Sequence, residues 1–424
     1  MLQINTLRNQ TQEVKDRLAV KNCKDINLVD QILQIDEERR NLQKQNDDLA
    51  AANNIASKEI GNLMKSGDKE AAEKLKETVS ANKEKAASIA EQLKAAEQQQ
   101  NDMLVQLPNL PHTSVPLGKT PEENEVVRTG GTVPSLPENA KAHWDIVAEK
   151  NIIDFELGTK ITGAGFPFYV GNGAKLQRAL INYFLDYNTA AGYTEYQAPL
   201  MVNEASAYGT GQLPDKEGQM YHATQDNFYL IPTAEVPLTN IFRNEIVATE
   251  QMPIKITGYT PCFRREAGSY GKDVRGLNRL HQFDKIEIVQ IVHPQNSYSV
   301  LEEMVAHVEK LIQSLEMPYR ILRLCGGDMS FASALTYDFE VYSTAQQRWL
   351  EVSSVSNFET FQTNRLMCRY RDENGKTQLA HSLNGSSLAL PRIVASLLEN
   401  HQQADGSITI PKALVPYFGA EYLK

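Results

Sequence analysis

The sequence predicts an α+β protein in which an N-terminal antiparallel two-helix coiled-coil arm precedes a domain built on an antiparallel mixed sheet. Three observations predict this. Two long heptad runs occupy the first quarter of the chain. The first proline, Pro108, marks an abrupt change of composition. Beyond it, strand-like runs are joined by loops and hairpins and not by regular βαβ alternation. We therefore expect one domain at residues 1–110 and a second at residues 111–424.

The first domain is predicted to be a long helical hairpin. Its seam positions alternate in steps of four and three, which average 3.5 residues, the period of a left-handed coiled coil. The first run comprises Leu28, Ile32, Ile35, Arg39, Leu42, Asn46, Leu49, Asn53, Ala56, Ile60 and Leu63. The second comprises Ala72, Leu75, Val79, Asn82, Ala86, Ile89, Leu93, Ala96, Gln100, Met103 and Leu107. The short polar link at residues 65–68 contains Gly67, and so short a link makes the two helices antiparallel.

A hairpin of this kind has more than one possible use. It can be a spacer or a dimerisation seam, although its two helices already pair with each other. Its flanks carry basic side chains such as Lys83 and Lys85, which fit a solvated face as well as a contact with phosphates. The pattern alone leaves these uses open.

The second domain mixes helices with strands. Residues 108–137 are rich in Pro, Gly, Thr and Glu, as a linker or a peripheral loop would be. Residues 175–187 have the apolar spacing of a helix. Strand-like runs follow at residues 228–231, 254–263, 281–292, 319–324 and 338–342.

Composition and charge narrow the class of protein. Hydrophobic residues make up 41% of the chain and charged residues 23%, which is typical of a soluble globular protein. We expect no membrane segment, because no run approaches the ~20 apolar residues that a spanning helix needs. The N-terminus lacks the apolar core of a secretory signal. The four cysteines are far apart with no C-x-x-C pair, which argues against a disulfide framework or a zinc site and favours the cytoplasm.

The net charge of −10 gives no support to a nucleic-acid partner, so any contact with RNA must use local basic patches. The sequence also contains neither the phosphate loop G-x-x-x-x-G-K-[ST] nor the dinucleotide fingerprint G-x-G-x-x-G. If the chain binds a nucleotide, it does so by another arrangement.

The most informative stretch runs from residue 259 to 271 and continues from residue 279 to 287. It is typical of a strand, a Gly-rich loop that includes residues 267–271, and a returning strand. Alternate residues of a strand share a face, so Arg264 and Glu266 are expected to point together, as are Phe283, Lys285 and Glu287. Such a set suits a nucleotide, because guanidinium binds phosphate and an aromatic ring stacks on a base. Scattered ion pairs on a surface hairpin are the alternative.

These residues resemble a known family. Phe263-Arg264-Arg265-Glu266 resembles motif 2 (F-R-x-E) of the class II aminoacyl-tRNA synthetases, and the block that continues to Glu287 is similar to that of the seryl-tRNA synthetases. Pro199 resembles the motif 1 proline of a dimer interface, and the hairpin resembles a tRNA-binding arm. Three more blocks follow the family order: Thr233-Ala234-Glu235, Glu351-Val352-Ser353-Ser354, and Asn384-Gly385-Ser386 with Leu388-Ala389-Leu390-Pro391-Arg392.

The resemblance covers essentially the whole chain and implies an ATP-dependent ligase with a class II catalytic domain. It implies that the enzyme uses ATP and Mg²⁺ to activate L-serine as seryl-adenylate and transfers the serine to tRNA(Ser). It further suggests tRNA(Sec) as an acceptor and a homodimer as the working form. Two other uses of the same core remain open, an amino acid:carrier protein ligase and a catalytically silent RNA-binding paralogue.

The resemblance also implies roles for individual residues at the ATP site. Arg264 would hold the α-phosphate and the serine carboxylate, and Glu266 would accept from the adenine amino group. Phe283 and Arg392 would sandwich the adenine ring, and Arg264, Glu266 and Arg392 are the implied catalytic residues. The remaining implied ATP contacts are Arg265, Glu351, Val352, Ser353 and Ser354, of which Glu351 and Ser354 would also coordinate Mg²⁺.

The implied serine site adds a second group of residues. Glu235 would bind the substrate ammonium, and Glu287 would read the serine hydroxyl. The other implied contacts are Thr233, Ala234, Arg264, Asn384 and Ser386.

One position departs from the family pattern. Pro391 stands where the family usually has glycine. Proline is tolerated in the first turn of a helix, but it would kink a helix that begins several residues earlier and would then misplace Arg392.

Overall fold

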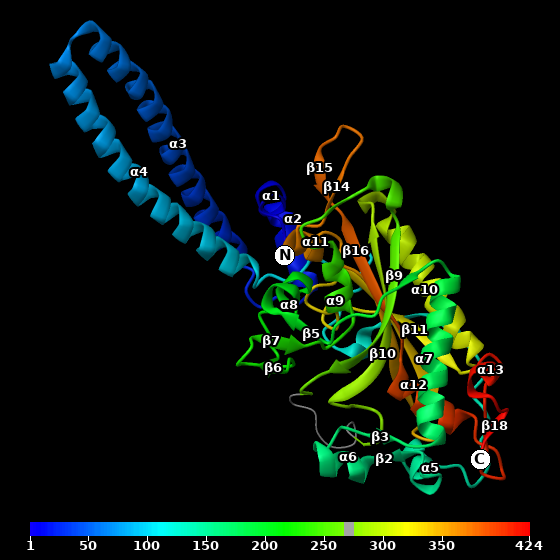
Figure 1. Cartoon of the computed structure of the whole chain (residues 1–424). Coiled ribbons are helices and arrows are strands. Elements are labelled where there is room, and N and C mark those ends of the chain that lie inside the picture. Colours follow the sequence, from blue (N-terminus) through cyan, green and yellow to red (C-terminus); the bar gives the residue numbers. More distant parts are fainter. Residues whose placement is uncertain (267–274) are drawn as a thin grey trace. The chain divides into compact units, whose positions relative to one another are not determined.

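The computed structural model describes residues 1–266 and 275–424, which form two compact units (Figure 1). The helical unit comprises residues 2–19 and 23–108, and the sheet unit comprises residues 1, 20–22 and 109–424. Residues 267–271 of the expected Gly-rich loop lie outside the described residues. No described helix combines the length and the apolar character that crossing a lipid bilayer requires.

The helical unit contains the predicted hairpin. Its helices are α3 (Leu28–Ser66) and α4 (Lys69–Leu104), and two short helices, α1 (Ile4–Asn9) and α2 (Thr11–Val20), precede them. Gly67 ends α3 with a φ of 86°, and the carboxylate of Asp68 caps α4 by accepting from the amide of Ala71 at 3.1 Å. The link is shorter than predicted, because α3 continues through Lys65 and Ser66.

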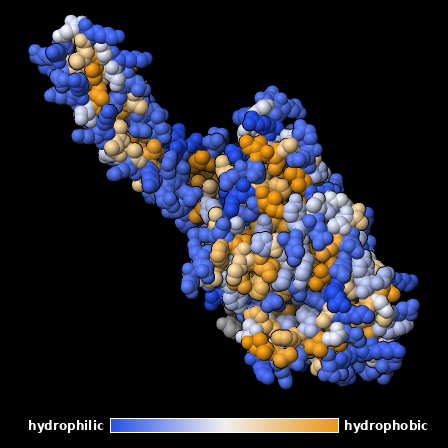
Figure 2. Space-filling view, viewed as in Figure 1, coloured by the Kyte–Doolittle hydropathy of each residue, from blue (hydrophilic) through white to orange (hydrophobic). Residues whose placement is uncertain are grey.

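The seam between α3 and α4 follows the predicted heptads. Leu42, Ala72, Val79 and Ala96 are buried, and the other predicted seam positions within the two helices are buried or half-buried. Nearly all the positions between them are exposed. Figure 2 shows hydrophobic residues along the middle of the hairpin and hydrophilic residues on its flanks. The period of 3.5 residues is therefore confirmed.

Asp36 is a buried charge that the heptads did not reveal. Its carboxylate accepts from Nε of Arg8 at 2.5 Å, from Nη2 of Arg8 at 2.6 Å and from Nε2 of Gln100 at 3.0 Å. Arg39 and Arg40 lie 3.6 and 3.2 Å away. Burial alone would raise the pKa of Asp36, but the hydrogen bonds from Arg8 and Gln100 outweigh it and lower the pKa below its usual value. Asp36 therefore ties α1, α3 and α4 together.

Asp36→Asn is expected to lower the free energy of unfolding of the helical unit by about 2 kcal/mol, because the arginines lose their shared anion but remain partly exposed. Urea unfolding of the full chain, followed by circular dichroism at neutral pH, measures this. Asp30→Asn is the matched control, since its ion pair with Lys15 at 2.7 Å lies at the surface. Equal effects of the two substitutions would contradict the role of Asp36. Because the pKa of Asp36 is lowered on folding, its contribution is lost as the pH falls through that pKa.

The sheet unit is built on an eight-stranded sheet of described strands. Its order is β1-β11-β12-β13-β16-β10-β9-β4, and every neighbouring pair is antiparallel except β4 and β9. The strands are β1 (Glu125–Gly130), β4 (Thr194–Glu195), β9 (Ile254–Phe263), β10 (Gln282–Val292), β11 (Tyr319–Arg323), β12 (Leu335–Ser343), β13 (Arg348–Asn357) and β16 (His381–Ala389). The predicted antiparallel mixed sheet is confirmed.

The predicted boundaries are only partly right. The run at residues 254–263 matches β9 at both ends, whereas no strand was predicted at the positions of β13 or β16. The expectation that residues 108–137 form only a linker or loop is wrong, because β1 pairs with β11 at the edge of the sheet. An edge strand such as β1 buries no complete face, so its sequence lacks a clear apolar alternation.

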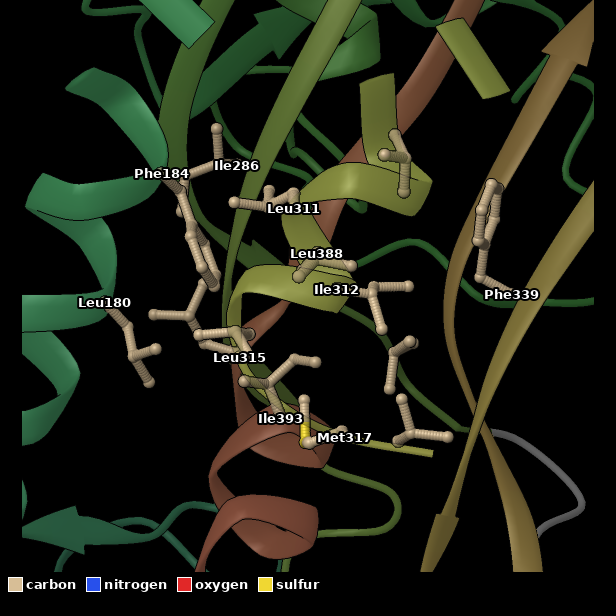
Figure 3. Close-up of a cluster of buried hydrophobic side chains, with 14 of the residues drawn as sticks. Leu180, Phe184, Ile286, Leu311, Ile312, Leu315, Met317, Phe339, Leu388 and Ile393 are labelled. Carbon is tan, nitrogen blue, oxygen red and sulfur yellow. The ribbon is translucent and has the colours of Figure 1, made fainter. Parts of the chain in front are cut away.

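The three longest helices of the sheet unit pack against this sheet: α7 (Asn172–Ala190), α10 (Ser297–Ser314) and α12 (Leu390–Asn400). Between them and the sheet lies the core, in which Phe184 of α7, Leu311 of α10 and Ile393 of α12 meet Ile286 and Leu388 of the sheet (Figure 3). The predicted helix at residues 175–187 lies within α7. Because side chains alternate along β10, Lys285 and Glu287 point to the opposite face of the sheet from Ile286.

Smaller elements complete the sheet unit. The helices are α5 (His143–Glu149), α6 (Phe155–Ile161), α8 (Glu204–Thr210), α9 (Glu235–Thr239), α11 (Phe361–Leu366) and α13 (Val415–Phe418). The short strands are β2 (Ile153–Asp154), β3 (Phe168–Tyr169), β5 (Met201–Asn203), β6 (His222–Ala223), β7 (Phe228–Leu230), β8 (Ile246–Val247), β14 (Arg369–Arg371), β15 (Thr377–Leu379), β17 (Ile408–Thr409) and β18 (Tyr422–Leu423).

Candidate active site

Arg264 and Phe283 meet where β9 and β10 pair. The amide of Arg264 donates to the carbonyl of His281 at 2.9 Å, which continues the ladder just past the end of β9. The guanidinium carbon of Arg264 lies 5.1 Å from the centre of the Phe283 ring, and its Nε donates to the carbonyl of Pro232 at 3.2 Å. A fixed guanidinium beside an aromatic face suits an adenine nucleotide.

Glu266 lies beyond the strand, and strict strand alternation does not apply to it. β9 ends at Phe263, and Glu266 has a φ of 47°, in the left-handed region. Its carboxylate accepts from Nη1 of Arg279 at 3.0 Å. The exposed Arg265 lies apart from Phe283, with its guanidinium carbon 5.9 Å from the centre of the Tyr221 ring. Arg264 and Arg265 thus contact different aromatic rings, Phe283 and Tyr221 respectively.

Arg392 lies in the first turn of α12 beside Glu351. Its Nη1 donates to the carbonyl of Glu351 at 2.6 Å and lies 3.6 Å from that residue's carboxylate, and its Nε donates to the carbonyl of Asn278 at 3.1 Å. Pro391 stands in the same first turn, which begins at Leu390, so the proline removes no intrahelical hydrogen bond. The tolerated placement of Pro391 is confirmed.

Two residues after Phe283 on β10, Lys285 begins a buried ion pair with Glu287. Nζ of Lys285 is 2.6 Å from Oε2 of Glu287 and donates to Oγ1 of Thr233 at 2.8 Å. Thr233 in turn donates to the Glu287 carboxylate at 3.1 Å. Lys285 and Glu287 share a face because they are two residues apart on one strand.

Glu235, the first residue of α9, lies next to this pair. Its amide donates to Oγ1 of Thr233 at 3.2 Å, and its carboxylate accepts from Nε2 of Gln362 at 2.6 Å. Burial, and then the neighbouring charge of Glu287, raise the pKa of Glu235 to about 7. Among the described residues, Nδ2 of the buried Asn384 has no hydrogen-bond partner, although its amide is close enough to favour the ionised form of Glu235. Two carboxylates, one ammonium and a spare amide donor thus converge here.

A bulge brings Glu351 and Ser354 to one face of β13. Residues three apart on a regular strand point to opposite faces, but the register with β12 shifts by one residue between Glu351 and Ser353. Oγ of Ser354 donates to Oδ1 of Asp338 at 2.6 Å. Burial, and then the charge of Glu351, raise the pKa of Asp338 well above its ordinary value.

The remaining predicted residues lie in the framework of the site. Ala234 is fully buried just before α9, and Val352 belongs to the hydrophobic core. Oγ of the buried Ser353 donates to the carbonyl of Ser386 at 2.6 Å, which ties β13 to β16. These contacts hold the strands of the site together.

Four residues of this region had no role assigned from the sequence: Gln362, Asp338, Arg279 and Lys285. Alternation along the strand had predicted that Lys285 shares a face with Glu287, but it did not predict their ion pair. Gln362 lies on α11, more than 120 positions from Glu235, and carried no local signal. Asp338 faces Ser354 only through the pairing of β12 with β13.

Comparisons with known proteins give a consistent result. Residues 1–111 match the family described as the seryl-tRNA synthetase N-terminal domain. Residues 219–401 match the family described as the tRNA synthetase class II core domain (G, H, P, S and T). The serine--tRNA ligase of Salinibacter ruber is 51% identical over 420 residues, which is 99% of this chain and 98% of that protein. The serine--tRNA ligase of Methylacidiphilum infernorum is 47% identical over the full length of both.

Solved structures agree. The seryl-tRNA synthetase of Pyrococcus horikoshii complexed with ATP superposes with a TM-score of 0.94 at 32% identity, over 100% of this chain and 99% of that one. The cytoplasmic serine-tRNA ligase of Naegleria fowleri in complex with AMP superposes with a TM-score of 0.88 at 28% identity, with the same coverage. The expected class II architecture is confirmed.

Proposed function

The chain belongs to the seryl-tRNA synthetase family, and from that premise we propose how its residues activate L-serine with ATP and transfer it to tRNA(Ser). The enzyme is an ATP-dependent serine–tRNA ligase that forms seryl-adenylate before the transfer. One observation carries the assignment of the site: Glu235, Lys285, Glu287 and the unpartnered amide of Asn384 converge beside the strand end that carries Arg264. Ionised, they leave one net negative charge for a small ammonium.

Serine recognition follows from these groups. Glu235 binds the substrate ammonium, and Glu287 accepts from the serine hydroxyl while Nδ2 of Asn384 donates to that hydroxyl's oxygen. Thr233, Ala234 and Ser386 shape the pocket around them. Alanine leaves Nδ2 of Asn384 without a partner and offers Glu287 no hydroxyl. A site built to bond a hydroxyl can reject such an analogue by up to roughly 10⁴-fold. This part of the site therefore supplies specificity.

Activation needs charge stabilisation rather than a general base. The serine carboxylate forms a bond to the α-phosphorus of ATP as the bond from that phosphorus to the β-phosphate oxygen breaks, so pyrophosphate leaves. The transition state spreads its charge over the phosphate oxygens. Arg264 binds the α-phosphate and the serine carboxylate. Glu266 accepts from the adenine amino group, and Phe283 and Arg392 stack on the two faces of the ring. The assignment of Arg265 to ATP rests on the resemblance alone.

Glu351 and Ser354 fit a magnesium ion by the chemistry of their donors. Both offer hard oxygen ligands, and the Ser354 hydroxyl donates a hydrogen bond to Asp338, so its oxygen lone pairs stay available to a cation. Among the described residues, no cluster of three or more His, Cys, Asp or Glu side chains could bind a metal by itself. Two protein ligands plus phosphates are the usual set for Mg²⁺, which when bound would neutralise the phosphate charge of ATP.

The affinity for serine is expected to fall below neutral pH. The pKa of Glu235 is about 7 in the free enzyme, but the substrate ammonium requires the carboxylate. Binding at lower pH must therefore expel a proton, so the KM for serine rises by about tenfold for each pH unit well below 7 and levels off above it. Serine-dependent exchange of pyrophosphate into ATP, measured at saturating ATP between pH 5.5 and 8.5, gives this profile.

Gln362→Leu provides a matched variant for that profile. The hydrogen bond from Gln362 favours the ionised form of Glu235, so its loss is expected to move the break in the profile to higher pH. Glu235→Gln should raise the KM for serine at every pH and flatten the profile. A KM that stays constant from pH 6 to pH 8 in the unmodified enzyme would contradict the role of Glu235.

Aminoacylation of purified tRNA(Ser) tests the choice of acceptor. We expect serine to reach tRNA(Ser), and by the same route tRNA(Sec), and not a carrier protein. Loading of a carrier protein in place of tRNA would favour the alternative of an amino acid:carrier protein ligase. If the enzyme forms seryl-adenylate but transfers serine neither to tRNA nor to a carrier protein, the assignment of tRNA as the acceptor is wrong.

We also propose that the enzyme works as a homodimer in the cytoplasm, where ribosomes consume charged tRNA. The support is a set of exposed apolar side chains around Pro199, in the segment that follows β4, the edge strand of the eight-stranded sheet. Tyr196, Leu200 and Met201 are each more than a third exposed there. Exposed apolar side chains gathered at an edge strand are a liability unless another chain covers them. Sedimentation equilibrium measures the mass in solution.

A further inference from the structure

His143 has no role in the proposed function, and it binds the backbone that leads into β10. Its Nε2 accepts from the backbone amide of Leu277 at 2.9 Å, and its Nδ1 lies 2.7 Å from Oε1 of Glu399. A backbone amide can only donate, so Nε2 carries no proton and the imidazole is neutral, with its proton on Nδ1. His143 thus links Glu399 to the backbone at Leu277.

Glu399 is a fully buried carboxylate, and hydrogen bonds to both of its oxygens stabilise it. Oε1 accepts from the amide of His143 at 3.0 Å, from Nδ1 of His143 and from Nε2 of Gln346 at 3.1 Å. Oε2 accepts from the hydroxyl of Ser343. Burial of a charge is costly unless such bonds are made, so the geometry of the whole group is fixed.

The same segment connects to Arg392. The carbonyl of Asn278 accepts from Nε of Arg392 at 3.1 Å, and the side chain of Asn278 donates to Gln346 at 3.1 Å. Arg392 and Glu399 are seven residues apart on α12, about two turns, and therefore lie on the same side of that helix. Residues 277 and 278 bridge these two positions.

Gly276 shows how closely the imidazole approaches this backbone. It has a φ of 67°, and a Cβ added there would lie 2.2 Å from Nε2 of His143. A side chain at this position would both strain the backbone and displace the ring. The sequence therefore leaves the space that the contact between His143 and Leu277 needs.

We propose that His143 and Glu399 are positioning residues for ATP. They fix the backbone of Leu277 and Asn278, and the Asn278 carbonyl then orients the guanidinium of Arg392 against the adenine ring. The inference rests on the role proposed above for Arg392. It predicts that the pair controls the KM for ATP and leaves the KM for serine unchanged.

The test uses serine-dependent pyrophosphate exchange with the full-length enzyme. His143→Leu is expected to raise the KM for ATP on the order of tenfold, since it removes both the acceptor for Leu277 and the donor to Glu399. The KM for serine should stay within about twofold. Leu311→Ala, a cavity variant in α10, is the control for a general loss of stability, and it should lower the active fraction without changing either KM. His143→Gln keeps an acceptor within reach of Leu277 and should recover most of the loss.

A double-mutant cycle tests the route through Arg392. Arg392→Lys removes Nε, so adding His143→Leu to it should raise the KM for ATP little further. Full additivity, or an unchanged KM for ATP in His143→Leu, would overturn the proposal. If His143→Leu does not fold, Gln346→Leu decides, because it removes the side-chain partner of Asn278 and should raise the KM for ATP by about threefold. Failure of the unmodified enzyme to exchange with serine would instead overturn the proposed function.

Discussion

Replacing Arg264 with alanine is expected to lower the kcat of serine-dependent pyrophosphate exchange by about a thousandfold. The guanidinium is half-buried, held by the carbonyl of Pro232 and stacked 5.1 Å from the centre of the Phe283 ring. Within residues 1–266 and 275–424, Arg264 makes this hydrogen bond through Nε alone. Its terminal nitrogens are therefore available for the proposed contacts with the α-phosphate and the serine carboxylate. Initial rates at saturating ATP and serine measure the loss.

Two further variants make this result specific. Arg264→Lys keeps the charge but loses the planar fork, so it should recover only a small part of the activity. Arg128→Ala removes an arginine from the edge strand β1, where it pairs with Glu302 and Glu309, and should leave the rate within about twofold. Exchange that persists near the unmodified rate in Arg264→Ala would exclude the proposed mechanism.

Shortening the helical hairpin is expected to abolish charging of tRNA but to spare adenylate formation. We would replace residues 50–85 with a four-residue Gly/Ser turn, which keeps the bonds of Asp36 to Arg8 and Gln100 at the base of the hairpin. The site residues all lie in the sheet unit, so exchange should stay within about twofold, whereas kcat/KM for tRNA(Ser) should fall at least a hundredfold.

The comparison of the two activities in one preparation is the control. Loss of both would mean that the shortened chain is misfolded, which circular dichroism and unfolding by urea would reveal. Unimpaired charging of tRNA(Ser) by a folded, shortened enzyme would contradict the assignment of the hairpin as the tRNA-binding arm.

Regular, local patterns were readable from the sequence. The heptads predicted the seam of α3 and α4 because a packed helical hairpin buries the same two positions in every seven residues. β9 was found at both ends because its β-branched and aromatic residues lie between Pro253 and the charged residues Arg264 and Arg265. The effect of Pro391 could not be predicted from the sequence alone, because it depends on the residue at which α12 begins.

Features that depend on pairing between distant residues were not readable. The bulge that brings Glu351 and Ser354 together exists only in the register of β13 with β12. Gln362 on α11 donates to Glu235 on α9. Asp36 accepts from Arg8 and Gln100, which lie on two other helices. These contacts come from tertiary packing, which no local spacing encodes.

The central claim is that this enzyme activates serine. Exchange of pyrophosphate into ATP, assayed separately with each of the twenty amino acids in the presence of Mg²⁺, tests it most directly. The account predicts exchange with serine and none above background with alanine, because alanine leaves Nδ2 of Asn384 without a partner and offers Glu287 no hydroxyl. Exchange with a different amino acid, or with none of them in a folded enzyme, would contradict it.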